Sequence, residues 1–178
     1  MLRGLFKRFR RERKGAATVE FVILLPAYLT VLIASYEAGI MMVRHAMLER
    51  GVDLAVRSLR LGTPQPPTFE EFKDSVCANT MIISDCDSVV QVELRPVSTT
   101  AWDPLGTGAN CIDVNSTIDP IDQTEFSVGV NNELMMVRVC GLYQPLFPTT
   151  TFGLEMPDVG SGHYALVVTS AFVNEPSR

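Results

Sequence analysis

The chain has 178 residues, a length that suits one modest domain plus a membrane anchor and argues against two full domains. Its hydrophobic content of 47% is concentrated near the N-terminus, and its net charge of −5 combines a basic N-terminus with an acidic remainder. A basic tail can bind nucleic acid, but here it adjoins an apolar run, which favours retention of charge on the cytoplasmic side of a membrane. We therefore expect no nucleic-acid partner.

Residues 1–15 form a basic leader. Glu12 is its only acidic residue, and its basic residues are Arg3, Lys7, Arg8, Arg10, Arg11, Arg13 and Lys14. Basic residues that flank a membrane span favour the cytoplasmic side. We predict that the N-terminus is cytoplasmic and that the chain beyond the span is exported.

Residues 16–43 are the predicted transmembrane segment. Their apolar run at 21–43 has about 23 residues, and a helix needs roughly 20 to cross the hydrocarbon core. Glu37 is the one charged side chain in this run. We expect its carboxylate to extend toward water at the outer boundary, with pairing to another helix as the alternative. Pro26 removes one backbone hydrogen bond and should bend or soften the helix.

A secretory signal peptide is the alternative interpretation of this N-terminus. The apolar region of a signal peptide usually has roughly 7–15 residues and ends at a small-x-small cleavage site. The apolar run here is longer and has no clean site of that kind. The sequence therefore favours a membrane anchor.

The helix should continue through residues 44–62. Apolar residues there recur at steps of four, three and four, which marks one helix face: Leu48, Val52, Ala55 and Leu59. On the polar side, Asp53 and Arg57 are spaced to pair across one turn. Gly62 and Pro64 should end the helix. This amphipathic stripe needs another element to pack against.

Residues 63–178 are predicted to form an exported α+β domain with a short helix and about three antiparallel strands. Thr68 is a candidate N-cap for a helix that should end near Asn79, with Glu70 and Glu71 favouring its first turn. The alternation of Val90, Val92 and Leu94 predicts a strand at 88–97, and we expect two further strands at 133–143 and 164–173. Turn-forming residues predict loops at 99–123 and 144–162. The simplest arrangement is a sheet packed on the amphipathic half of the long helix.

The exported part contains an even number of cysteines, which in a small exported domain indicates two disulfides: Cys77, Cys86, Cys111 and Cys140. Three connectivities are possible. We favour Cys77–Cys86 with Cys111–Cys140, because the first closes a short local loop and the second ties a long loop to a strand. There is no CxxC pair, and zinc would need closer ligand spacing, so we expect neither a metal nor another cofactor.

The junction between leader and span reads KGAATVEF at residues 14–21. It resembles a type IV prepilin processing site and, more closely, the TadE-like family of minor pseudopilins from tight-adherence (Tad/Flp) pilus systems. The resemblance covers mainly residues 10–60 and implies a pilin-like fold. It also implies that the prepilin peptidase cuts after Gly15, that Ala16 becomes the new N-terminus, and that Glu20 is the fifth mature residue, followed by the typical aromatic Phe21.

Each part of this junction has a physical reason. Glycine lets an extended backbone lie deep in a protease cleft. After cleavage, the new amine at Ala16 is positively charged, and Glu20 of a neighbouring subunit can neutralise it in a poorly solvated bundle of helices. Gly15 or Glu20 alone could be incidental, but their order beside a basic leader is much harder to obtain by chance.

The resemblance implies a minor pilin or pseudopilin in the assembly of a tight-adherence pilus. It would lie in the bacterial inner membrane with a periplasmic domain, and could enter a surface pilus. Its partners would be that membrane, the prepilin peptidase, and other pilin and minor pilin subunits, with no small-molecule substrate. The alternatives are an uncleaved single-span envelope scaffold and a surface-binding protein of the same system.

No enzyme signature supports a catalytic role. The sequence has no HExxH, GxSxG or Walker A motif. His45 and His163 are isolated, so we expect ordinary polar surface residues rather than general bases. Trp102, in a polar loop, is expected to pack as a loop anchor. We predict that this chain is not an enzyme.

Overall fold

The computed structural model describes residues 16–60, 66–80, 83, 85–100, 111, 126–148 and 162–175. The elements are α2 (Ala16–Arg60), α3 (Phe69–Asn79), α4 (Cys86–Val89), β1 (Val90–Pro96), β2 (Leu134–Tyr143) and β3 (Tyr164–Val173). The predicted α+β class is confirmed: a long apolar N-terminal helix precedes a small domain with a short helix and three antiparallel strands. The predicted leader with Gly15, the helix stop at Gly62 and Pro64, and Trp102 lie outside the described residues.

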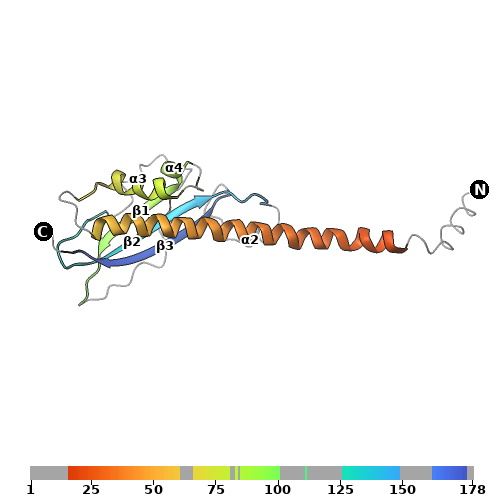
Figure 1. Cartoon of the computed structure of the whole chain (residues 1–178), viewed down its shortest axis with the longest axis horizontal. Coiled ribbons are helices and arrows are strands. Elements are labelled where there is room, and N and C mark those ends of the chain that lie inside the picture. The colour runs from red at the N-terminus through yellow and green to blue at the C-terminus, as the bar shows by residue number, and fades with distance from the viewer. Residues whose placement is uncertain are drawn as a thin grey trace, which may run out of the picture.

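The long helix α2 has 45 residues and divides into two halves with different surroundings. Its N-terminal half projects away from the domain, and its C-terminal half lies against the sheet and α3 (Figure 1). All members of the predicted apolar stripe are buried: Leu48, Val52, Ala55 and Leu59. The predicted pair of Asp53 and Arg57 is wrong, because no ion pair joins them in the described part of the chain and both are exposed to solvent.

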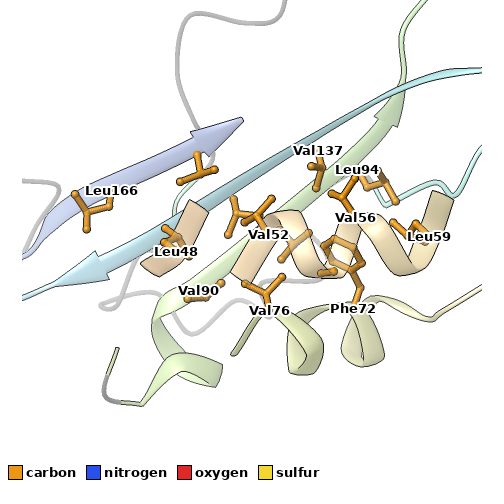
Figure 2. Packing of buried hydrophobic residues seen from close by; sticks show 14 of the residues in the cluster. Leu48, Val52, Val56, Leu59, Phe72, Val76, Val90, Leu94, Val137 and Leu166 are labelled. Atoms are coloured by element: carbon orange, nitrogen blue, oxygen red, sulfur yellow. The ribbon is translucent and has the colours of Figure 1, made fainter. Parts of the chain in front are cut away.

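The sheet is an antiparallel meander in the order β1-β2-β3. Val92, Val139 and Val168 form one row across it, with Val92 opposite Val139 and Val139 opposite Val168. Alternate residues of each strand therefore share the face that α2 and α3 cover. Figure 2 shows this core, in which side chains of α2 meet those of α3 and of all three strands.

The short helix α3 begins as the sequence predicts. The Thr68 hydroxyl accepts a hydrogen bond from the Glu71 N–H at 3.3 Å, and the Glu71 carboxylate accepts one from the Thr68 N–H at 2.8 Å. This reciprocal capping box satisfies two N–H groups that the helix itself leaves without partners. Phe72 and Val76 are buried against α2, so the cap fixes where the apolar face of α3 begins.

The strand predicted at 88–97 begins later than predicted, at Val90. Residues 86–89 form the single helical turn α4, which follows Asp85 in a left-handed conformation with φ of 54°. The Ser88 N–H and hydroxyl both donate to the Asp85 carbonyl, at 2.9 and 2.8 Å. The Ser88 N–H is therefore engaged in the turn and unavailable to the sheet.

Two disulfides link the domain. Cys77 at the end of α3 bonds to Cys86 at the start of α4, and Cys111 bonds to Cys140 in the central strand β2. These are the pairs that we favoured from the sequence. The first joins the end of α3 to the start of α4, and the second ties Cys111 to the middle of the sheet.

Candidate functional site

The candidate processing and assembly residues lie at the start of α2. The helix begins at Ala16, and the side chains of Glu20 and Phe21 are exposed, Phe21 by 61%. Within the described residues, the Glu20 carboxylate forms no hydrogen bond or ion pair. It can therefore accept a cation from another molecule. Gly15, the other half of the predicted processing site, lies outside the described residues.

The N-terminal half of α2 exposes apolar side chains around its circumference: Val19, Phe21, Val22, Ile23, Leu24, Tyr28, Leu29, Val31, Leu32 and Tyr36. The hydroxyl groups in this half are satisfied inside the helix, since Thr30 donates to the Ala27 carbonyl and Ser35 to the Val31 carbonyl. α2 continues through Pro26 without interruption. It is long and apolar enough to cross a membrane.

Glu37 has surroundings that differ from both sequence-based expectations. Its side chain is only 1% exposed. The Leu146 N–H donates to one carboxylate oxygen at 3.0 Å, and the Phe147 N–H donates to the other at 3.2 Å. The expected extension toward water is therefore wrong, and the partners are backbone amides of a loop rather than another helix. Two N–H donors stabilise a buried carboxylate, which explains why this position tolerates burial.

Arg44, two turns further along the same face of α2, binds the neighbouring part of this loop. Its Nη1 donates to the Gln144 carbonyl at 3.2 Å, and its guanidinium lies 5.0 Å from the centre of the Tyr143 ring. Burial raises the pKa of the Tyr143 phenol above its usual value of 10.0, and the negative charge of Glu37 raises it further. We call Glu37, Arg44 and residues 143–147 the α2 clamp. It joins the end of β2 to α2.

The sequence contains a signal that would have found the clamp. The buried stripe that starts at Leu48 extends backward in steps of four, three and four to Arg44, Met41 and Glu37. Met41 packs against the core and Glu37 is buried. A charged residue on the core-facing stripe of a helix must find a partner inside the fold, which is a stronger constraint than its closeness to the membrane boundary.

A second apolar surface lies on α2 beside the clamp. A shallow hollow there is lined by Ala38, Met41, Met42, His45, Ala46 and Glu49. Met42 is 72% exposed, and His45 lies 3.5 Å from the Glu49 carboxylate, in an ordinary helical pair one turn apart. This surface suits contact with an apolar face of another helix.

The part of the chain that the structure describes contains no candidate metal site. No group of three or more His, Cys, Asp or Glu side chains gathers there. His163 lies directly before β3 and is half-buried. The features that distinguish this chain are therefore the exposed apolar half of α2, the Glu20 carboxylate and the α2 clamp.

Comparison with known proteins bears on the same helix. The family model described as TadE-like protein matches residues 15–57. The match begins at Gly15 and includes Glu20, the exposed apolar half of α2, and both Glu37 and Arg44 of the clamp. No curated protein and no solved structure matches the chain. The chain therefore carries a TadE-like segment at residues 15–57.

Proposed function

We propose that this protein is a minor pilin or pseudopilin that takes part in the assembly of a tight-adherence (Flp-type) pilus. The observation that carries the proposal is a TadE-like segment that starts at Gly15 and continues into a long, exposed, apolar helix. The chain performs no chemistry itself and needs no cofactor. It is a substrate of the prepilin peptidase and a structural partner of other pilin and minor pilin subunits.

In this proposal the protein spans the bacterial inner membrane once. The basic residues 1–15 hold the N-terminus in the cytoplasm, and the domain lies in the periplasm. Two disulfides suit that oxidising compartment. The peptidase cuts after Gly15 on the cytoplasmic face and leaves Ala16 as the mature N-terminus.

The mature helix then supports assembly through its exposed groups. Glu20 neutralises the Ala16 amine of a neighbouring subunit, an interaction that is stronger in a water-poor bundle than on a solvated surface. The apolar hollow around Met41 and Met42 offers a neighbouring helix a contact near the outer end of the predicted span. Charge pairing sets the axial position of the subunit, and apolar contact adds affinity.

Peptide mapping of the N-terminus tests the processing step. The protein is isolated from native membranes and from sheared pili, and we expect it to begin at Ala16 in both. Gly15→Leu should block cleavage, because a side chain at that position obstructs an extended backbone in the protease cleft. Gly4→Leu, a glycine substitution elsewhere in the leader, is the matched control and should leave cleavage intact.

A chain that still begins at Met1 in cells with active peptidase would overturn the prepilin assignment. The uncleaved single-span envelope scaffold would then be the better model. This outcome is separate from membrane anchoring, which α2 can provide with or without cleavage.

Pilus counts test the role of Glu20. Glu20→Ala should reduce surface pili strongly while the amount of protein in the membrane stays unchanged, because the substitution removes a charge needed only between subunits. Asp53→Ala removes an exposed carboxylate further along α2, outside the apolar hollow, and should have a much smaller effect on pili. Normal piliation with Glu20→Ala would reject charge neutralisation at this position.

A further inference from the structure

The clamp holds an apolar loop at one defined level of α2. The loop at 144–148 reads QPLFP and contains no charged residue. Leu146 is 50% exposed and Phe147 is 38% exposed. Their backbone N–H groups are bound by Glu37, and the Gln144 carbonyl is bound by Arg44. The backbone is therefore fixed against α2 while two large apolar side chains remain accessible.

The loop contacts α2 at Glu37 and Arg44, around the outer end of the segment predicted to cross the membrane, residues 16–43. From Ala17 to Tyr36, α2 has no buried side chain, and the first buried side chain is Glu37. A helical stretch of that length rises about 30 Å at the standard 1.5 Å per residue. The hydrocarbon core of a bilayer is about 30 Å thick. The loop thus lies at the level where the exposed apolar half of the helix ends.

Two features favour lipid over a protein partner for this surface. The exposed apolar pair is held against α2 at Glu37, directly after Tyr36 of the span, which is 57% exposed. Tyrosine and tryptophan concentrate at this depth, at the boundary between membrane and water. A loop without charges can also enter the interface without leaving an ion in an apolar medium.

We propose that the 144–148 loop is a second membrane contact, which places Leu146 and Phe147 in the outer leaflet beside the emerging helix. The loop and α2 together fix the tilt of the domain over the bilayer, which a single helix cannot do. This inference rests on the proposed function only in requiring that α2 crosses a membrane. It is independent of cleavage and of pilus assembly.

Depth-dependent fluorescence quenching tests this inference on the full chain in phospholipid vesicles. Trp102→Phe removes the single native tryptophan. In that background, single tryptophans are placed by Phe147→Trp, by Leu29→Trp within the span, and by Val130→Trp in the turn before β2, at the end of the domain far from the clamp. Bromine atoms are placed either high or deep along the lipid acyl chains, and the loss of tryptophan emission is measured.

We expect the tryptophan at 147 to be quenched, more by shallow than by deep bromines. The tryptophan at 29 should be quenched strongly and that at 130 very little. If positions 147 and 130 behave alike while position 29 is quenched, the loop does not touch lipid and the inference is overturned. If position 29 is also unquenched, α2 does not cross the bilayer, which overturns both this inference and the anchor of the proposed function.

A second series tests the dependence on the clamp. Glu37→Gln replaces one acceptor oxygen with an NH₂ group that faces an N–H donor, so it should loosen the loop and lower quenching at position 147 by at least half. Glu49→Gln, at an exposed position of the same helix, is the matched control and should leave quenching unchanged. Equal quenching in both variants would show that the clamp does not position the loop.

Discussion

At the scale of single residues, Glu37 is where α2 first binds the domain through buried hydrogen bonds. Burial of a carboxylate is costly unless donors replace the water it loses. Here the donors are two consecutive backbone N–H groups, at 3.0 and 3.2 Å. They belong to a loop more than 100 residues away in the sequence, so their binding to Glu37 holds a distant part of the chain against α2.

We predict that Glu37→Ala destabilises the folded domain by about 1–3 kcal/mol, because it removes two charge-assisted hydrogen bonds and leaves both N–H groups without an acceptor. Glu37→Gln keeps one acceptor and should fall between Glu37→Ala and the unchanged protein. Equilibrium unfolding in denaturant, with the full chain in detergent micelles, measures the difference.

Glu49→Ala is the control for these substitutions. Its side chain is 55% exposed and, within the described residues, pairs with His45 alone in a surface contact, so the effect of the substitution should stay within about 0.5 kcal/mol. If Glu37→Ala is as mild as Glu49→Ala, the hydrogen bonds of the clamp make no net contribution to stability.

The candidate site could be predicted from the sequence in part, and Glu37 shows where prediction ended. The junction at 14–21 is a local motif, so its residues can be recognised without a fold. The backward extension of the stripe from Leu48 also indicates that Glu37 faces the core. The identity of its partners cannot be obtained in this way, because any backbone N–H can bind a carboxylate and the loop residues carry no distinguishing side chain for that role.

At the scale of elements, the contact between α2 and α3 depends on a glycine. A Cβ at Gly51 would overlap the Thr80 hydroxyl and lie 3.0 Å from the Val76 carbonyl. Thr80 in turn donates to that same carbonyl at 2.6 Å and is almost fully buried. The end of α3 therefore sits directly on the backbone of α2, and neither the carbonyl nor the bonded hydroxyl can move freely.

We predict that Gly51→Ala destabilises the domain by about 1–3 kcal/mol through this overlap, although alanine is intrinsically the better helix former. Gly39→Ala is the matched control in the same helix, because a Cβ there meets nothing within 4 Å. It should be neutral or stabilise by up to about 1 kcal/mol. Thermal unfolding followed by circular dichroism compares the two, and a stabilising Gly51→Ala would contradict the close approach of the helices.

The elements themselves were largely predictable, and the exception is instructive. β2 and β3 were predicted within one residue of their ends, and α3 was found from its cap and its apolar face. The start of β1 was predicted two residues too early, because the alternation at Val90, Val92 and Leu94 does not define where the strand begins. The turn at Asp85 and the disulfide at Cys86 determine the conformation there, and both act through contacts that alternation does not report.

At the scale of the whole molecule, the two halves of α2 have separate roles. The buried residues of α2 lie between Glu37 and Leu59, and none of the described side chains before Glu37 is buried. Folding of the domain thus needs the second half of the helix and not the first. A shared helix also means that any movement of the span is transmitted rigidly to the domain.

We predict that a fragment of residues 36–178 is soluble and folded, because it retains the buried stripe and the clamp. A fragment of residues 45–178 should have a lower melting temperature, by roughly 2–4 °C per kcal/mol lost. Shortening alone frays a helix, so the control is the 36–178 fragment with Glu37→Gln and Arg44→Gln, which keeps the length and loses both charges. It should melt close to the shorter fragment. If the double variant has the same melting temperature as the unchanged 36–178 fragment, the charges are dispensable and apolar packing from Leu48 onward suffices. If the unchanged fragment fails to fold, the domain depends on the first half of α2.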